Sequence, residues 1–312
     1  MCSRFLNPMA ALLDRGFVGH ASACHPSASS DCVFSASRAV RLLLIATLLT
    51  AAIASAAQPP VLRVCAEPDN LPYSNQRGEG FENRIAELTA RDLGMKLEYV
   101  WWTQRRGFVR SSLNEGLCDA LMEMPAASDL VSVTRPYYRS TYVWITRKDR
   151  GAPVAGFDDP RLKQWKIGIH RTGGDVAPPG VALGRRGLAA NLEQYSLFGE
   201  YGAANPPARL IEAVHDGSVD AAIAWGPLAG YFASSDLQVT PVSPAEFDGV
   251  PFTFAVAMGV RKGDTELRAK LDAVITRRCA EIRNILNQYR VPLVGSQEES
   301  CESQPLSRVS PR

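Results

Sequence analysis

A short polar segment near the start of the folded chain carries side chains that could bind a ligand. Alternating apolar residues over 62–66 predict a strand, and Pro68 ends it. Tyr73, Ser74 and Asn75 follow, with hydroxyl and amide groups that can donate and accept hydrogen bonds. Open α/β sheets bind ligands beyond the carboxyl ends of their strands, so these residues are candidate ligand contacts. The alternative is that they only form a turn.

Aromatic and cationic side chains stand near the ends of several other predicted strands and helices. Together with Tyr73 they form the candidate cleft set, whose other members are Trp102, Arg105, Arg106, Arg171, Thr172, Trp225 and Gly226. Arginine forks and ring faces predict an anionic or planar ligand, or a protruding element of a partner protein. Alternatively, Trp225 is a core aromatic, Arg106 belongs to a solvated helix face, and Arg171 caps local carbonyls.

Patterns for catalysis and metal binding are weak. Glu67, Glu82 and Glu123 are the carboxylates best placed to act as an acid or base, and His170 and His215 have no partner nearby in sequence. The chain has no nucleophile elbow, no Cys-x-x-Cys metal motif and no Cys-x-x-Cys-His haem motif. The sequence therefore predicts no metal, no cofactor in this chain and no catalytic residue.

Composition describes an ordinary globular protein. The chain has 312 residues, of which 46% are hydrophobic and 21% are charged, enough for two lobes with separate cores. The formal net charge is +2, and no block of like charges stands out. Neither nucleic acid nor a membrane surface is an implied partner.

Residues 1–57 read as a leader rather than as part of the fold. Arg38 and Arg41 precede an apolar run over 42–49, and small residues follow at 54–56. This pattern predicts a secretory signal peptide cleaved near Ala56 or Ala57, and hence a soluble periplasmic protein. The long Ser- and Ala-rich stretch before the signal is interpreted as the product of a misplaced start codon.

Cysteine usage agrees with an oxidising compartment. Three of the seven cysteines fall in the leader, and the remaining four are Cys65, Cys118, Cys279 and Cys301. Four cysteines allow three pairings, of which we favour Cys65 with Cys118 and Cys279 with Cys301. The first bridge would stabilise the fold by about 4 kcal/mol through loop closure. The alternative is that these are free buried thiols.

Hydrophobic patterning predicts alternating strands and helices. Strands are expected over 62–66, 97–101, 119–124, 140–146, 165–170, 192–197, 219–225 and 252–260, with a loop over 125–138. Helices are expected over 81–93, 105–117, 207–215 and 226–232, then two more from Asp264, whereas Pro178 and Pro179 should prevent an immediate long helix. The predicted parts are lobe 1 over 58–149, lobe 2 over 150–241, a return to lobe 1 over 242–294, and a flexible tail over 295–312. Each lobe should be a mostly parallel α/β sheet flanked by helices.

Six sequence blocks carry a family resemblance. They lie at 65–75, 78–83, 101–108, 135–142, 205–209 and 224–231. The whole mature chain resembles the type II periplasmic solute-binding proteins of the amino-acid class, with two crossings between the lobes. More narrowly, the blocks resemble the quinoprotein-dehydrogenase-associated branch of the MxaJ/XoxJ type.

Two positions depart from ordinary amino-acid binders. In that class an arginine shortly before the Ser/Thr-x-Pro-Tyr segment holds the ligand carboxylate, and counting back from Pro136 places Ala127 there. An aspartate holds the ligand ammonium after the strand that here ends at Trp225, and this chain has Gly226 and Pro227. Losing one partner of a desolvated charge pair costs about 2 to 5 kcal/mol, so we expect no useful amino-acid affinity.

The resemblance implies a non-catalytic periplasmic accessory factor. Its expected partner is a methanol or alcohol dehydrogenase that depends on pyrroloquinoline quinone (PQQ), possibly together with its cytochrome c, and the chain would assist maturation, activation or electron transfer. The alternative function is the solute-binding component of an ABC importer for a small polar or anionic ligand other than a standard amino acid. A third reading, a periplasmic dehydratase, would need an acid or base in the cleft.

Overall fold

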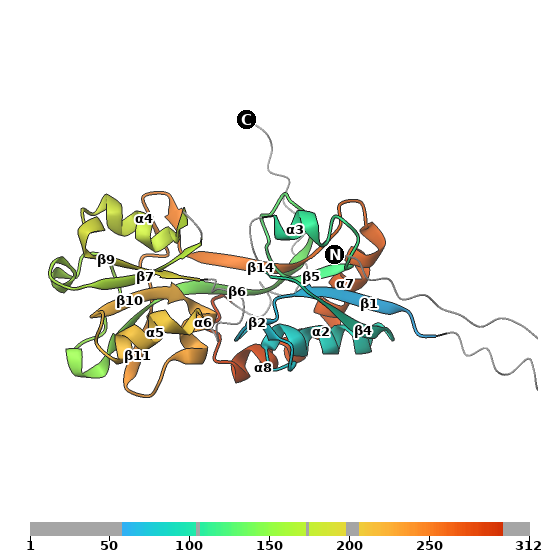
Figure 1. Ribbon diagram of the computed structural model, residues 1–312, viewed down its shortest axis with the longest axis horizontal. Helices are drawn as coiled ribbons and strands as arrows, with labels where there is room; N and C mark the ends of the chain where they lie inside the picture. The colour runs from blue at the N-terminus through green and yellow to red at the C-terminus, as the bar shows by residue number, and fades with distance from the viewer. Residues whose placement is uncertain (1–57, 104–106, 173–174, 198–205, 296–312) are drawn as a thin grey trace, which may run out of the picture. The chain divides into compact units, whose positions relative to one another are not determined.

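Ten strands form one mixed sheet around which the chain is organised. The computed structural model describes residues 58–103, 107–172, 175–197 and 206–295. The sheet follows the order β4-β1-β5-β14-β6-β10-β7-β8, with β11 beside β6 and β9 beside β7 (Figure 1). Two long strands, β6 (Ser132–Arg147) and β14 (Thr253–Val260), join its two halves and pair antiparallel with each other. They provide the two crossings predicted between the lobes.

The first half of the sheet is parallel at its outer edge. Its strands are β1 (Val61–Ala66), β4 (Lys96–Trp101) and β5 (Ala120–Pro125), and β1 pairs parallel with both neighbours. Three helices cover it, namely α2 (Phe81–Asp92), α7 (Thr265–Arg277) and α8 (Cys279–Gln288). Their apolar faces bury a core that includes Phe81, Ile85, Met258, Ile275 and Ile282.

The second half repeats the α/β pattern. Its strands are β7 (Ile167–Thr172), β8 (Asp175–Val176), β9 (Leu192–Ser196), β10 (Ala221–Trp225) and β11 (Leu237–Pro241). Its helices are α4 (Pro178–Arg185), α5 (Ala208–His215) and α6 (Gly226–Phe232). β7 runs parallel to β9 and β10, and separate cores form around Trp144 and around Val143. The α/β fold with parallel strands and flanking helices is therefore confirmed.

Short elements complete the described chain. They are the strands β2 (Asp69–Asn70), β3 (Ser74–Asn75), β12 (Glu246–Phe247) and β13 (Val250–Pro251), the helix α3 (Phe108–Ser111), and 3-10 turns at Lys148–Arg150, Pro160–Lys163 and Ala189–Asn191. β2 and β3 pair, so the polar segment after β1 is a small hairpin rather than an irregular loop. Within the described ranges, no helix has the length and apolarity of a membrane span.

One predicted disulfide is present. Cys65 in β1 and Cys118 just before β5 are bonded, and both side chains are buried among Leu113, Leu121 and Met124. The bridge therefore pins the two neighbouring strands together at the edge of a small separate core. Cys301 lies outside the described residues, so its pairing with Cys279 stays a prediction.

Two predicted elements were wrong in extent. Within the described residues, the helix expected over 105–117 is only the four residues of α3, because Gly107, with φ of 90°, is left-handed just before it and Ser112, with φ of −123° and ψ of −76°, leaves helical geometry just after it. The loop expected over 125–138 ends early, since β6 already begins at Ser132. Pro136 is tolerated inside this strand because the pairing of β6 with β14 is irregular there.

Two prolines lie at the start of α4. Pro178 and Pro179 occupy the first positions of α4, where a missing backbone N–H costs nothing. The expectation was that they would prevent an immediate long helix; a helix does begin at once, but it is only eight residues long.

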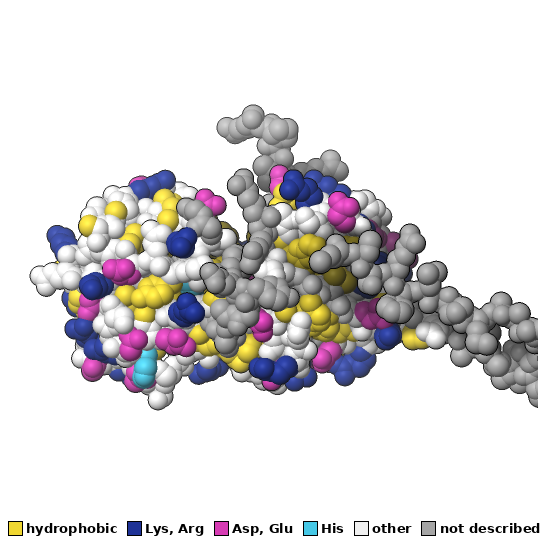
Figure 2. All heavy atoms as spheres, viewed as in Figure 1, with side chains coloured by type: hydrophobic (Ala, Val, Ile, Leu, Met, Phe, Trp, Pro, Cys, Tyr) yellow, Lys and Arg dark blue, Asp and Glu magenta, His cyan; other side chains and the backbone are white. Residues whose placement is uncertain are grey.

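Charged side chains are dispersed over the visible face of the molecule. Figure 2 shows basic and acidic side chains interspersed on both halves, without a large area of one sign. This distribution agrees with the small net charge of +2. On this face, the described side chains offer no extended basic surface of the kind that nucleic acid needs.

Candidate functional site

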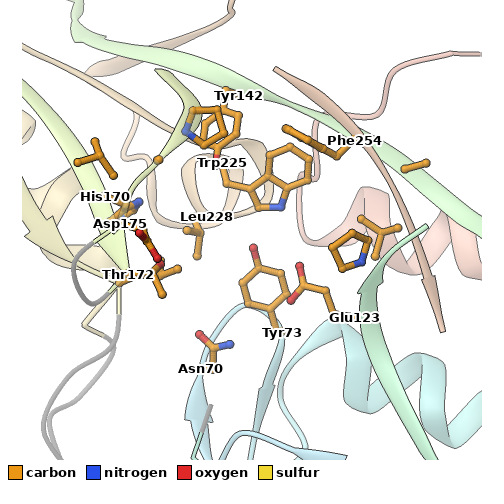
Figure 3. Close-up of a pocket in the computed structure, with 17 residues that line it drawn as sticks. Asn70, Tyr73, Glu123, Tyr142, His170, Thr172, Asp175, Trp225, Leu228 and Phe254 are labelled. Atoms are coloured by element: carbon orange, nitrogen blue, oxygen red, sulfur yellow. The ribbon is translucent and has the colours of Figure 1, made fainter. Parts of the chain in front are cut away.

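A pocket of about 470 Å³ lies where β5, β6, β10 and β14 meet the end of β7 and the start of β8. Its volume is typical of small-molecule sites. The described residues that line it are Asn70, Tyr73, Glu123, Pro125, Tyr142, His170, Thr172, Asp175, Val176, Ala177, Pro178, Leu197, Trp225, Leu228, Phe254, Ala255 and Val256 (Figure 3). Both halves of the sheet therefore contribute to it.

Three rings form one wall of the pocket. The ring centroids of Tyr142 and Trp225 are 5.3 Å apart, those of Trp225 and Phe254 are 5.9 Å apart, and each pair meets edge to face. These distances are in the favourable range for aromatic pairs. Trp225 is thus held by its neighbours, yet it is only half-buried and lines the pocket. It combines the core role and the cleft role that the sequence left as alternatives.

Tyr73 reaches the pocket from the β2–β3 hairpin. Its backbone carbonyl accepts a hydrogen bond from the N–H of Glu82 at 2.9 Å, and its ring lies 5.2 Å from that of Phe81, so the hairpin is fixed to the start of α2. The close approach requires a glycine, because a Cβ at Gly80 would lie 1.9 Å from the Tyr73 carbonyl oxygen. In Figure 3 the Tyr73 hydroxyl points toward the Trp225 indole.

A pair of carboxyl groups lies beside Tyr73. Glu123 of β5 lines the pocket and is partly exposed to it, whereas Glu82 of α2 is buried and its Oε1 has no hydrogen-bond partner among the described residues. Burial raises the pKa of both carboxyls, and for Glu82 the charge of Glu123 adds to the effect. Like charges near each other cannot both ionise cheaply, so at least one carboxyl of the pair stays protonated near neutral pH.

Buried tyrosines surround these carboxyls. Tyr137 donates to the carbonyl of Met122 at 2.8 Å, while the hydroxyl of Tyr138 has no hydrogen-bond partner within the described ranges. Burial raises the pKa of both phenols, so they remain neutral. The carboxyl pair therefore lies in a site of low polarity, which strengthens any charge interaction made there.

Ser74 and Asn75 build the hairpin rather than the pocket wall. The Ser74 hydroxyl donates to the carbonyl of Glu67 at 2.8 Å. The Asn75 amide donates to a carboxylate oxygen of Glu79 at 2.7 Å, and its Oδ1 accepts from the Glu79 N–H at 2.9 Å. Neither residue lines the pocket, so the turn-forming alternative describes their contacts in this structure.

The remaining candidates divide into two groups. Thr172 lines the pocket, as do Tyr73 and Trp225, whereas Trp102, which is 41% exposed, and the exposed Arg171 do not. Gly226 begins α6 and is buried behind the wall. Arg105 and Arg106 lie outside the described residues. A role for any of these residues in binding stays a prediction.

Several pocket residues escaped the sequence reading. Tyr142 and Phe254 were assigned only to strands, and their meeting depends on the pairing of β6 with β14, which no local pattern reveals. Asp175 was not among the candidates from the sequence. His170 is buried against the pocket, and its Nε2 lies 3.2 Å from the carbonyl oxygen of Pro207. Burial lowers its pKa to about 4, so it is neutral at physiological pH.

The charged groups in the described lining of the pocket are acidic. Among its described lining residues the charged types are Glu123 and Asp175, and neither Arg nor Lys is among them. An anionic ligand held by arginine forks has no support from this part of the chain.

The fold and the pocket define a solute-binding protein. The chain belongs to the bacterial extracellular solute-binding proteins, family 3, whose model matches residues 62–290. It is 35% identical over 267 residues to protein MoxJ of Methylorubrum extorquens. The matched residues make up 80% of this chain and 87% of MoxJ.

Two solved structures are similar over most of the described chain. The crystal structure of periplasmic binding protein XoxJ from Methylobacterium extorquens AM1 is 35% identical, with a TM-score of 0.62, and covers 75% of this chain and 100% of that one. The structure of MxaJ from Methlophaga aminisulfidivorans MPT is 26% identical, with a TM-score of 0.64 and the same coverage. The resemblance to the MxaJ/XoxJ type is thereby confirmed. An ancestral cationic amino-acid binding protein, 20% identical with a TM-score of 0.59, shares the fold.

Proposed function

We propose that this chain is a non-catalytic periplasmic accessory factor of a PQQ-dependent methanol or alcohol dehydrogenase. The observation that carries the proposal is the 35% identity to MoxJ over 80% of the chain. The chain itself would hold no cofactor. Its partners would be the dehydrogenase and, during electron transfer, the cytochrome c, and its work would be maturation, activation or coupling of that enzyme.

Local packing supports the loss of an amino-acid site. At Gly226, where amino-acid binders are expected to carry the ammonium-holding aspartate, a Cβ would lie 2.6 Å from the Thr141 carbonyl oxygen and 2.8 Å from the Ser140 hydroxyl. A side chain cannot enter there without moving the backbone of β6. Ala127, at the expected arginine position, lies exposed in the turn after β5. Both charged grips are thus replaced by residues that cannot form them.

Gene deletion tests the accessory role in the native host. Loss of this chain should reduce methanol oxidation in the periplasm and the fraction of dehydrogenase that carries its quinone, and a plasmid copy should restore both. Unchanged activity and unchanged cofactor loading in the deletion strain would refute the proposal. Export can be followed in the complemented strain, because the mature chain should be recovered from its periplasm with an N-terminus near Ala57.

The second candidate is the solute-binding component of an importer. The pocket of about 470 Å³ favours it, since that volume suits a small molecule. Permease and ATPase genes beside this one, together with a metabolite that raises the melting temperature, would support import. Neighbouring dehydrogenase and cytochrome genes would support the accessory role.

A further inference from the structure

The pocket combines aromatic rings with acidic groups, a combination that favours ligands of positive charge. Tyr73, Tyr142, Trp225 and Phe254 supply rings, and Glu123 and Asp175 supply carboxyls. In Figure 3, Tyr73 and Glu123 lie together on one side of the pocket, Trp225 and Tyr142 lie above them, and Asp175 lies on the opposite side. Ring faces attract cations, most strongly where water is excluded.

We propose that this pocket binds a small organic cation, whose ammonium group lies against the rings of Tyr73, Tyr142 and Trp225 and is balanced by Glu123 and Asp175. The rest of the ligand would be apolar, since Leu197, Leu228 and Val256 also line the pocket. The inference is independent of any dehydrogenase, because it rests on the pocket alone.

An organic cation fits this pocket better than a metal ion. Hard metal ions require several oxygen ligands around one point, and within the described ranges no three His, Cys, Asp or Glu side chains are grouped closely enough to hold one. Glu123 and Asp175 come from β5 and β8, on opposite sides of the pocket. Two separated carboxyls with rings between them suit an ammonium group carried on an organic molecule, which needs no closed shell of oxygen ligands.

The buried carboxyl pair links binding to pH. A cation beside Glu123 would favour its ionised form, so binding should release a proton at any pH where Glu123 is protonated in the free protein. The titratable groups that face it are Glu82 from α2, Tyr73 from the hairpin, Tyr137, Tyr138 and Tyr142 from β6, and His170 and Asp175 across the pocket. Burial keeps the phenols and His170 neutral near pH 7. Affinity should therefore increase with pH, by up to about tenfold per pH unit.

Four probes of similar shape test the charge preference by isothermal titration calorimetry on the mature protein. They are phenethylammonium, phenethyl alcohol, hydrocinnamate and phenylalanine, which are a cation, a neutral molecule, an anion and a zwitterion. Phenethylammonium should bind at least about tenfold more tightly than each of the others, as expected for a partly desolvated charge pair. Its binding heat should vary with the ionisation enthalpy of the buffer, which reports the released proton.

Matched variants locate the site. Glu123→Gln should weaken phenethylammonium binding at least about tenfold and abolish the proton release. Trp225→Leu should weaken it by about twofold to thirtyfold through the lost ring face. Glu115→Gln removes an exposed carboxyl far from the pocket lining and should change neither quantity. Asp175→Asn changes an exposed residue at a strand end, so it should weaken phenethylammonium binding without disturbing a core. It replaces Glu123→Gln as the test if that variant fails to fold.

Three results would overturn the proposal. One is equal or tighter binding of phenethyl alcohol, hydrocinnamate or phenylalanine. Another is wild-type affinity for phenethylammonium in both carboxyl variants. The third is the absence of any binding of phenethylammonium up to about ten millimolar, which is weaker than any useful site. Cation binding with no effect of gene deletion on the dehydrogenase would refute the accessory role and leave this inference standing.

Discussion

Replacing Glu82 by glutamine should change how the stability of the protein depends on pH. Glu82 is 7% exposed, its Oε1 has no hydrogen-bond partner among the described residues, and its pKa is raised by burial and then by Glu123. In the unfolded chain the same carboxyl ionises near its ordinary pKa. Above that pKa the folded state therefore binds more protons than the unfolded state.

The sign and size follow from proton linkage. When the folded state binds one extra proton, the free energy of unfolding falls by about 1.4 kcal/mol for each pH unit. The stabilisation is complete below the unfolded pKa and is lost as pH rises toward the raised folded pKa. Glu82→Gln removes this dependence, whereas burial still raises the pKa of Glu123 in the variant. Between about pH 5 and about pH 7 the variant should gain up to about 3 kcal/mol relative to the wild type.

Urea denaturation at several pH values measures this difference directly. Wild type, Glu82→Gln and the surface control Glu115→Gln should be compared under oxidising conditions, so that the disulfide stays intact. The control should follow the wild-type curve. A Glu82→Gln curve that runs parallel to the wild type, with a difference that changes by less than about 0.5 kcal/mol over this range, would refute the account of the buried carboxyl pair.

Three further predictions concern the scaffold. Replacing both Cys65 and Cys118 by alanine should lower the free energy of unfolding, measured in urea, by about 4 kcal/mol. This is the value expected for a closed loop with a sequence separation of 53. A loss below about 1 kcal/mol would contradict this role of the bridge. Gly80→Ala should lower the melting temperature by several degrees, because its Cβ would overlap the preceding hairpin. The control Gly184→Ala, whose Cβ meets nothing within 4 Å, should leave the melting temperature unchanged or raise it. Equal effects of the two variants would contradict the packing argument. In an NMR titration the imidazole of His170 should ionise only near pH 4, because burial lowers its pKa. Since the folded pKa is lowered, the contribution of His170 to stability should be lost as pH falls from about 6.5 toward 4. Titration near pH 6.5 would show that His170 is not buried as described.

Sequence periodicity was enough to predict most of the regular elements. The helix expected over 81–93 is α2, and the strand expected over 252–260 is β14, because a single apolar face and a buried run specify each one locally. The disulfide between Cys65 and Cys118 was also predicted, since both cysteines flank strands of the same lobe. The errors fell at α3, which is shorter than expected and begins only after the left-handed Gly107, and at β6, where Pro136 stands in an irregularly paired strand.

The pocket was harder to predict than the fold. Tyr73 and Trp225 were found because each stands at the end of a strand, where ligands of α/β sheets bind. Glu123 was considered only as an acid or base, and Tyr142 and Phe254 only as parts of strands, because only the order β5-β14-β6-β10 brings the three together. A sequence gives the alternation of side chains along one strand, but it does not show which strands will be neighbours.

The most direct test of the central claim is recovery of the tagged mature chain from the periplasm of its own host, followed by quantitative mass spectrometry of the proteins retained. We expect a quinoprotein alcohol dehydrogenase in nearly equimolar amount, and its loss from an untagged control. Recovery of an ABC permease instead, with glutamate or another standard amino acid held in the pocket, would contradict the assignment.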